Sequence, residues 1–432
     1  YGLNYSSNDL DARLQKRWGL LVQQHVRMTQ SVSAGVQALS DGCSSFAYTQ
    51  AAWRFFRHER VTLPVLYEPL VKAGLSGIDE CQTYGLVIHD WSRLHYGRHT
   101  SKEDKIQMSH QWDVGYELQS SLLISDVTGQ PIAPLVQNLI TSEGNHSSLH
   151  EDVQPEVAAH LDELTTRLGQ IKDLGFSKPL VHLIDREADS VLHLRAWQAQ
   201  GHYWLTRSRE NSRVEVAGRS LSVKALAAEI PLVCQGQMIL QGKSRQLWVG
   251  ECDALLTRKA KPKQALGKKI AGDALPLRVI VSRVMSDEAK PKLIAEWYLL
   301  SNLPKTTDTL TLTQWYCWRW QIESLFKLLK TAGFGLENWQ QETGKALAKR
   351  LAVACCACVL VWQIMRQDSL KEMQLFLVRL SGRQMKRTAP VTAPALLAGL
   401  WAFLTTLDLL AQYDVQQLYD MANQLFPNRY RQ

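Results

Sequence analysis

Two aspartates follow short, branched apolar runs in this chain of 432 residues. Asp90 comes directly after the run LVIH, and Asp185 comes directly after LVHLI. Such runs predict buried strands, so we expect each carboxylate to emerge at the carboxyl end of a strand, where open α/β sheets place their chemistry. A single aspartate at such a position is often only a turn residue or a helix cap. Two of them justify a search for a third acid.

The third acid, Glu323, lies in the segment WYCWRWQIESLFKLLK at residues 315–330. At about 100° per residue, Tyr316, Arg319, Glu323 and Lys330 share an arc of about 60°. The neighbouring arc holds the apolar residues Trp315, Trp318, Ile322, Leu325, Phe326 and Leu329. We therefore predict one amphipathic helix that packs by its apolar stripe and presents an adjoining polar line.

These residue types suit phosphodiester chemistry. Three carboxylates can bind two Mg²⁺ ions about 4 Å apart, while Arg, Lys and Tyr side chains hold the phosphates in line. A simpler alternative is that Arg319 and Glu323, four residues apart, form a surface ion pair contributing a few tenths of a kcal/mol. The polar line adjoins the packed face of the helix, which favours a site.

The spacing of the polar line carries a family resemblance. Tyr316, Arg319, Glu323 and Lys330 form the pattern Y-x2-R-x3-E-x6-K, which resembles the signature of bacterial insertion-sequence transposases, the group that includes the transposase of the composite kanamycin-resistance transposon. The pentapeptide DREAD at residues 185–189 is similar to the sequence around the second catalytic acid of that family. The resemblance covers most of residues 10–345 and becomes vague in the tail.

The resemblance implies a cut-and-paste DDE transposase with Asp90, Asp185 and Glu323 as catalytic residues and metal ligands. It implies two Mg²⁺ ions, which Mn²⁺ can replace, a hairpin intermediate, and transfer of 3′-hydroxyl ends into target DNA. The partners implied are double-stranded DNA and a second copy of the chain, with the helical tail as the interface. By the same resemblance and by their chemistry, the DNA-contacting residues are Tyr316, Arg319, Lys330, Arg186, Trp297, Arg54 and Arg57.

Some of these assignments have alternatives. Asp104 and Asp126 lie near Asp90, and no sharp motif marks the first acid, so only its place after the run LVIH favours Asp90. Trp297 resembles the tryptophan on which the family stacks a flipped base, a contact worth about 1–3 kcal/mol, but it also fits a core aromatic in a strand. The basic run at residues 258–263 with Lys268 and Lys269 is either a phosphate-contacting loop or a solvated one.

The elements that must position the acids indicate an α/β protein. A chain of this length exceeds a single core, since cores stop growing near about 250–300 residues. The apolar patterns predict a helical DNA-binding module at residues 1–70, whose first helix has an apolar stripe formed by Leu10, Leu14, Trp18, Leu21 and Val22. The stretch WRFFR at 53–57 resembles the DNA-binding region of the family. They predict a catalytic core at 71–345, ribonuclease-H-like by resemblance, with a β-rich insertion at about 210–301. A helical C-terminal region follows at 346–432. A helical cap whose charges only face solvent is an alternative for the first module.

Composition is consistent with these expectations. Lys and Arg outnumber Asp and Glu by 49 to 41, giving a formal charge of +8, which suits a polyanionic partner. The eight cysteines show no disulfide-like or zinc-like spacing, so we expect a reducing compartment and a core helix around the segment ACCACV at 354–359. The family resemblance implies that this compartment is the bacterial cytoplasm, near the nucleoid. The nearly apolar run at 351–365 is short of the roughly 18–20 residues that span a bilayer, so we expect no membrane segment. The chain begins at Tyr1 without a methionine, which is consistent with a trimmed start or a start inside the gene.

Two other functions remain compatible with the sequence. One is a non-catalytic DNA-binding regulator derived from a transposase, although the complete set of acids argues against it. The other is a ribonuclease-H-like nuclease that hydrolyses DNA without strand transfer. An assay for joined DNA products would distinguish these from a transposase.

Overall fold

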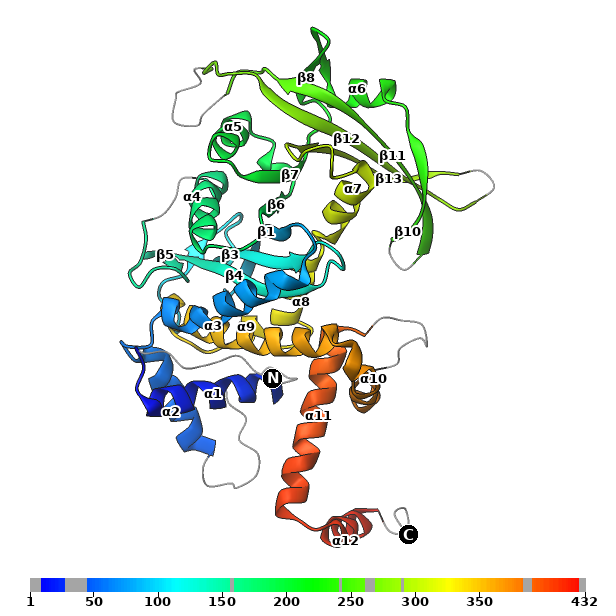
Figure 1. The fold of residues 1–432 in the computed structure, drawn as a ribbon. Helices are drawn as coiled ribbons and strands as arrows, with labels where there is room; N and C mark the ends of the chain where they lie inside the picture. Colours follow the sequence, from blue (N-terminus) through cyan, green and yellow to red (C-terminus); the bar gives the residue numbers. More distant parts are fainter. Residues whose placement is uncertain are drawn as a thin grey trace.

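The computed structural model describes residues 9–27, 45–155, 159–240, 243–260, 269–288, 291–383 and 391–426 (Figure 1). Its centre is a mixed sheet of 13 strands. Along the sheet the order is β5 (Gly144–Ser147), β4 (Pro131–Thr141), β3 (Val114–Ser125), β1 (Gly85–His95), β6 (Leu180–Ile184), β7 (Tyr203–Arg207), β13 (Leu293–Ser301), β12 (Leu275–Met285), β11 (Lys243–Leu256), β8 (Arg213–Val216) and β9 (Arg219–Ser222). Off this path, β2 (Ile106–Gln107) pairs with β3 and β10 (Val233–Leu240) pairs with β11.

Helices precede, interrupt and follow the strands. They are α1 (Ala12–Arg27), α2 (Ser45–Arg57), α3 (Leu63–Gly77), α4 (His160–Asp173), α5 (Val191–Ala199), α6 (Val223–Glu229), α7 (Thr309–Trp318), α8 (Gln321–Leu329), α9 (Gly344–Arg366), α10 (Lys371–Leu380), α11 (Ala393–Gln412) and α12 (Val415–Leu425). Short 3₁₀ turns occur at η1 (Ile78–Glu80), η2 (Arg186–Ala188), η4 (Leu336–Asn338) and η5 (Asp368–Leu370). The prediction of an α/β protein is confirmed, because helices accompany one large mixed sheet.

The middle of the sheet combines two pairing modes. β1 runs antiparallel to β3, and β3 runs antiparallel to β4, whereas β1 and β6 are parallel, as are β6 and β7. Helices α3 and α9 pack on one face of these strands, and α4 and α5 lie toward the other (Figure 1). Both faces are covered, which explains why β1 and β6 begin as continuous apolar runs rather than alternating patterns.

The strands between residues 213 and 301 lie where the β-rich insertion was predicted. They do not form an isolated sheet, because β13 pairs with the edge of β7 through Leu299 and Arg207. Their apolar side chains share a core with α4 and α5. The strands beyond β7 are therefore rigidly continuous with the centre of the sheet.

The N-terminal helices pack on the rest of the chain. The apolar stripe that was predicted for the first helix is buried: Leu10, Leu14, Trp18, Leu21 and Val22. These residues share a core with α9, in which Cys355, Cys356 and Cys358 are fully buried and free. The segment ACCACV is thus a core helix, as predicted.

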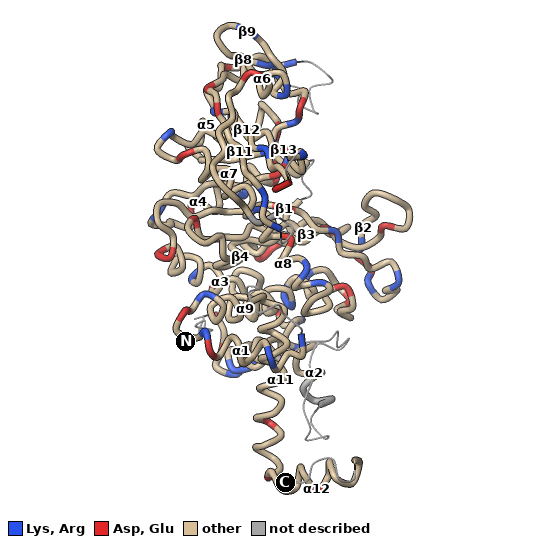
Figure 2. The backbone as a smooth tube through the Cα atoms, turned by 90° about the vertical axis from the view of Figure 1, so that its right-hand side faces the viewer, with Lys and Arg blue, Asp and Glu red and all other residues tan. Residues whose placement is uncertain are grey.

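Within the described part of the chain, two helices, α9 and α11, are long and apolar enough to cross a membrane by length and composition alone. In α9, 83% of the apolar window is buried inside the protein, as expected of a core helix. In α11 only 22% is buried, and Figure 2 shows this helix projecting from the body with Asp408 as its single charged residue. The apolar surface of α11 is therefore uncovered in the single chain.

Candidate active site

The parallel register of β1 and β6 brings the first two predicted acids together. The paired residues run from Gly85 with Leu180 to Ile88 with Leu183, a constant offset of 95 positions. The same offset, two steps further, joins Asp90 and Asp185 (185 − 90 = 95). The two carboxylates are close enough for the charge of Asp185 to raise the pKa of Asp90, although burial of Asp90 is the larger cause of that rise.

Asp90 does not lie at the end of its strand, in contrast to the expectation from the sequence. β1 continues to His95, because its second half keeps pairing with β3, from Trp91 with Gln119 to His95 with Gly115. What ends near Asp90 is the pairing with β6, whose last residue is Ile184. The prediction that Asp185 follows the carboxyl end of its strand, β6, is confirmed, whereas the prediction that Asp90 lies at the end of β1 is wrong. A strand continues for as long as either neighbouring strand pairs with it, and β3 still pairs with β1 beyond Asp90.

Arg319 joins the first and third acids. Its Nη1 donates to Oδ2 of Asp90 at 2.9 Å, and its Nη2 donates to Oε1 of Glu323 at 3.4 Å. The Arg319 side chain is only 12% exposed, so this contact is partly shielded from water. Asp185 lies close enough to Arg319 to raise its pKa as well. One guanidinium therefore binds two of the predicted acids, Asp90 and Glu323, and the charge of the third, Asp185, acts on it.

The helix that was predicted over residues 315–330 is broken. α7 ends at Trp318 and α8 begins at Gln321, with hydrogen bonds of the shorter, three-residue type at the joint, from Arg319 N to Tyr316 O (3.1 Å) and from Ile322 N to Arg319 O (3.3 Å). The apolar stripe is still mostly buried on both sides of the joint. A helical wheel identifies the residues that face inward but does not reveal this break, which lies at Arg319, the residue whose side chain contacts Asp90 and Glu323.

Burial sets the protonation of the site. It raises the pKa of Asp90 and of Glu323, while the Arg319 guanidinium lowers both and so keeps them closer to the charged form. Burial also raises the pKa of Tyr316 to about 12, with Arg319 and Arg207 opposing the rise. The Tyr316 hydroxyl is therefore protonated at neutral pH and can donate a hydrogen bond.

Lys330 is already engaged. Its Nζ donates to the backbone oxygen of Arg93 in β1 and lies 3.3 Å from Oε1 of Glu337. It belongs to the polar line in sequence, but in the folded chain it ties the end of α8 to β1. A role in neutralising DNA phosphate would require it to leave these partners.

The two alternatives for the first acid both have structural partners. Asp126 accepts backbone hydrogen bonds from Gln82, Thr83 and Tyr84 at 2.7 to 3.0 Å and so closes a turn. Asp104 is buried and accepts from the Tyr116 hydroxyl and from the backbone nitrogen of Gly344. Of the three aspartates, Asp90 is the one that contacts Arg319 beside Glu323, which favours Asp90 as the first acid.

The remaining predicted DNA contacts are spread over the protein. Arg186 is exposed on η2, beside Asp185, and Trp297 is half-buried on β13, where it packs against two clusters of apolar residues. Arg54 is exposed on α2. Arg57 stacks on the Trp53 ring at 3.7 Å and forms an exposed ion pair with Glu342, so it is partly committed to the protein itself.

The basic loop is only partly described, because residues 261–268 lie outside the described part of the chain. Arg258, at its start, does not face solvent as a phosphate ligand would. It forms an ion pair with the fully buried carboxylate of Asp189, the last residue of the DREAD pentapeptide. Asp189 also accepts from the Ser208 hydroxyl (3.1 Å) and from the backbone of Arg209 (2.8 Å). This carboxylate thus anchors the inserted strands to the loop that carries Asp185.

Two residues that the sequence did not single out lie beside the acids. Arg207 follows the β6 and β7 register, since Ile184 pairs with Thr206 and the next step joins Asp185 to Arg207. His160, at the start of α4, stacks on Trp91 with ring centroids 4.6 Å apart, and its two nitrogens face Glu117 (3.0 Å) and Glu187 (3.1 Å). These hydrogen bonds, chiefly the one to Glu117, raise the pKa of His160 to about 10. No local motif marks either residue, because each depends on pairing between distant segments.

The donor set suits hard divalent cations, since three carboxylates supply only oxygen ligands. A pair of ions about 4 Å apart needs a wider arrangement than a single ion does. Among the described residues, the one group of three acidic or imidazole side chains with ligand atoms within 4.8 Å of one another is Asp104, Glu143 and His146, not the predicted acids. Because the Arg319 guanidinium lies between Asp90 and Glu323, the predicted acids can bind a pair of ions only if this guanidinium moves out of the space between them.

Comparison with known proteins bears on the whole of this region. The family model described as the transposase DDE domain matches residues 83–360, which include all three predicted acids. A search of the curated proteins finds no match. Among solved structures, the synaptic complex of the piggyBac transposase with hairpin DNA matches at a TM-score of 0.36 and 10% identity, over 99% of this chain and 80% of that one. A similarity this low carries no argument about the fold or the site.

Proposed function

Because this chain belongs to the transposase DDE domain family, we propose that it cleaves the ends of a mobile DNA element with Asp90, Asp185 and Glu323 and transfers the freed 3′-hydroxyl ends into target DNA. The observation that carries the proposal is the convergence of these acids on Arg319. Asp90 and Glu323 both bind its guanidinium, and Asp185 follows Asp90 by the offset of the parallel register.

The proposed core is ribonuclease-H-like. Its support is the strand order β4, β3, β1, β6, β7, in which the first three strands are antiparallel and the last two run parallel to β1. In this order the acids lie on the two central parallel strands and on a helix that follows the insertion.

Asp90, Asp185 and Glu323 would hold the divalent ions, Mg²⁺ by proposal, with Mn²⁺ able to replace it. Bound ions of this kind lower the pKa of water and stabilise charge on the phosphodiester. The Arg319 guanidinium is the positive charge that contacts Asp90 and Glu323. We propose that it turns toward the DNA phosphate when cations take its place, since an Arg guanidinium fits a phosphate in a bidentate manner.

The surrounding side chains would orient the DNA. The Tyr316 hydroxyl, protonated at neutral pH, would donate to a phosphate oxygen. Arg186 follows Asp185 in the sequence, and Arg207 lies opposite Asp185 when the register of β6 with β7 is extended by one residue. Both side chains carry a positive charge that attracts a polyanion. Trp297, half-buried, would stack on a base, and Arg54 and Lys330 would contact the backbone more remotely.

We further propose that two copies hold two element ends, with the C-terminal helices at the interface. The support is a set of exposed apolar side chains on these helices: Met373, Leu375, Phe376, Leu380, Leu407, Leu410, Val415, Met421, Leu425 and Phe426. Exposed apolar surface of this extent commonly marks a protein interface. A hairpin intermediate and a cytoplasmic, nucleoid-associated location complete the proposal, as expectations from the family resemblance.

The central test is cleavage by a Glu323→Gln variant on a plasmid that carries the element ends defined by footprinting. We expect Mg²⁺-dependent cleavage to fall by at least about 10³-fold, as when a catalytic charge is removed, while binding to the end duplex stays measurable. Glu151→Gln, an exposed glutamate far from Asp90 in sequence, is the control. Wild-type cleavage by the Glu323 variant would refute the assignment, and cleavage without products joined to a supercoiled target would indicate a nuclease.

A further inference from the structure

A second group of potential metal ligands lies away from the predicted acids, at the turn between β4 and β5. Glu143 lies in this turn, His146 lies in β5, and Asp104 comes from the segment before β2. One ligand atom from each side chain lies within 4.8 Å of the others. None of the three belongs to the site formed around Arg319.

Asp104 is held in a fixed orientation. Its side chain is buried, with Oδ1 accepting from the Tyr116 hydroxyl and Oδ2 accepting from the backbone nitrogen of Gly344 at 2.6 Å. Gly344 is the first residue of α9, and the packing there is tight. A Cβ on this glycine would lie 2.4 Å from Cγ2 of Thr141 and 2.9 Å from Oδ2 of Asp104. Each carboxylate oxygen has a second lone pair, so these hydrogen bonds leave capacity for a cation.

His146 provides the independent observation. It is 4% exposed, and its Nε2 is fully buried without a hydrogen-bond partner among the described residues. A buried polar nitrogen without a partner costs free energy, and such groups in folded proteins commonly contact an ion or a water. Cδ2, the ring carbon bonded to Nε2, lies 3.5 Å from the position of a Cβ on Gly344, the same position that Asp104 Oδ2 approaches to 2.9 Å. The unpartnered edge of the ring therefore lies toward Asp104.

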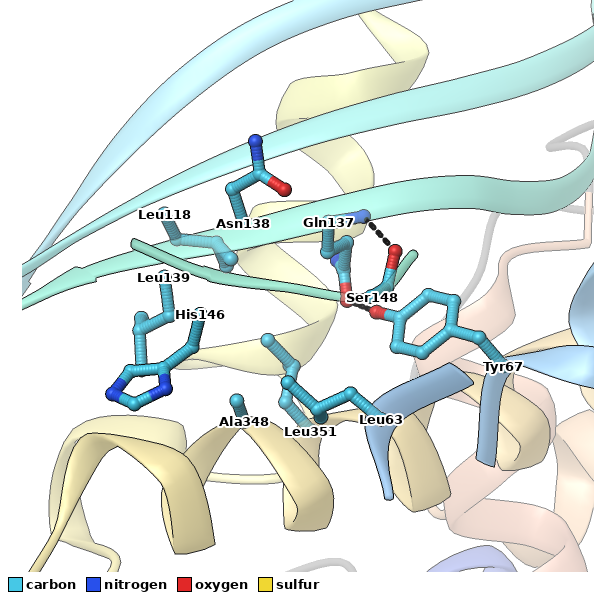
Figure 3. Close-up of a pocket in the computed structure, with 10 residues that line it drawn as sticks. All are labelled: Leu63, Tyr67, Leu118, Gln137, Asn138, Leu139, His146, Ser148, Ala348 and Leu351. Carbon is cyan, nitrogen blue, oxygen red and sulfur yellow. Dashed lines mark hydrogen bonds between the residues drawn. The ribbon is translucent and has the colours of Figure 1, made fainter. Parts of the chain in front are cut away.

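The other side of His146 borders a small pocket between β4 and α9. Figure 3 shows the ring beside Leu139 and above the helix that carries Ala348. Three polar residues elsewhere in this pocket are hydrogen-bonded to one another: Tyr67 donates to Gln137, and the Gln137 backbone donates to Ser148 at 3.0 Å. His146 Nε2 does not share in these hydrogen bonds.

We propose that Asp104, Glu143 and His146 bind one Zn²⁺ ion, which fastens the β4–β5 turn to the N-terminus of α9. One imidazole nitrogen and two carboxylates are a common Zn²⁺ ligand set, with water completing the tetrahedron. Lys102 and Lys345 lie close enough to these groups to affect their charges. These lysine charges repel any divalent ion equally, so the choice between ions rests on the ligands: imidazole suits Zn²⁺, whereas Mg²⁺ prefers oxygen ligands alone. Burial lowers the pKa of His146, which keeps the ring in the neutral form that binds metal.

The test uses the full chain carrying Asp185→Asn and Glu323→Gln, so that the predicted catalytic acids cannot account for bound metal. Zn²⁺ is measured by equilibrium dialysis after chelation. We expect one equivalent of Zn²⁺ and a rise in melting temperature of a few degrees when it is added. Adding Glu143→Gln, at an exposed side chain where the fold should tolerate the change, is expected to weaken Zn²⁺ binding at least tenfold and to abolish the thermal shift. His146→Asn should do the same.

Glu151→Gln in the same background is the matched control and should bind Zn²⁺ unchanged. The inference is overturned if the parent background binds no stoichiometric Zn²⁺, or if the Glu143 and His146 variants bind it as tightly as their parent. Because the catalytic acids are disabled throughout, neither result depends on whether the chain cleaves DNA.

Discussion

Arg319 Nη1 lies 2.9 Å from Asp90 Oδ2, although the two residues are separated by 229 positions in the chain. The contact joins the centre of the sheet to the break between α7 and α8. It also places a side-chain cation between two of the predicted acids, Asp90 and Glu323.

Replacing Arg319 with alanine should impair both the chemistry and the metal-free fold. We expect single-turnover cleavage of an end duplex to fall by about 10²–10³-fold, because a preorganised positive charge is lost from the phosphate site. In the presence of chelator the variant should also melt at a lower temperature than the wild type, since the acids then lack a counter-charge. Arg319→Lys should recover part of the thermal stability, because it keeps the positive charge. It should recover little of the cleavage, because a lysine ammonium lacks the planar guanidinium that binds two oxygens side by side. Equal cleavage by wild type and alanine variant would contradict the role.

His160 should make stability depend on pH. Its folded pKa of about 10 exceeds the usual value of about 6.5, so its ion pairs with Glu117 and Glu187 stabilise the fold fully below about pH 6.5 and lose that effect as pH rises through about 10. We expect His160→Gln to be less stable than the wild type at pH 6 and to approach it at pH 10, as measured by urea unfolding. His110→Gln, at an exposed histidine, should parallel the wild type across this range. A constant difference between the His160 variant and the wild type would exclude this explanation.

Asp189 should contribute strongly to stability through its buried ion pair with Arg258. Replacing one partner of such a pair leaves the charge of the other partner buried without a counter-charge. We therefore expect Asp189→Asn to lower the free energy of unfolding by about 3–5 kcal/mol. The control is Asp253→Asn, which breaks the exposed pair with Lys305 and should cost at most about 1 kcal/mol. Similar losses for the two variants would show that the Asp189 carboxylate does not anchor the inserted strands.

Gly115 should tolerate no side chain. A Cβ there would lie 1.8 Å from the backbone oxygen of Leu94, on the half of β1 that follows Asp90. We expect Gly115→Ala to lower the melting temperature and, by shifting β1, to reduce cleavage. Gly169→Ala on α4, where nothing lies within 4 Å of the added Cβ, should instead be neutral or stabilising by up to about 1 kcal/mol. The comparison separates the loss of a close strand contact from the general effect of replacing a glycine.

The C-terminal helices should determine the oligomeric state. Leu407 and Leu410 are 46% and 45% exposed on α11, and we expect the double change to glutamate to convert a dimer into a monomer in light-scattering measurements. Leu192→Glu, on the exposed face of α5, should leave the dimer intact. A wild-type chain that is monomeric at micromolar concentration, or that partitions into membranes, would contradict the proposed interface.

Much of the architecture is contained in local sequence patterns. The apolar runs before Asp90 and Asp185 predicted two buried strands, and the stripe from Leu10 to Val22 predicted a buried helix face. These patterns succeed because burial repeats with the period of each element, and that period is visible without knowing what the element packs against. The spacing of Tyr316, Arg319, Glu323 and Lys330 also predicted a transposase, and the chain belongs to the transposase DDE domain family; the narrower insertion-sequence group stays a prediction.

The relationships between distant segments were decided only by the tertiary structure. The register of β1 with β6 juxtaposes Asp90 and Asp185, the joint at Arg319 and Trp320 breaks a helix that its periodicity predicted to be continuous, and Lys330 is bound to β1. The partners of Asp189 and His160 likewise come from strands and loops tens of residues away. Local propensity cannot contain this information, because strand register and side-chain pairing depend on which surfaces meet when the whole chain packs.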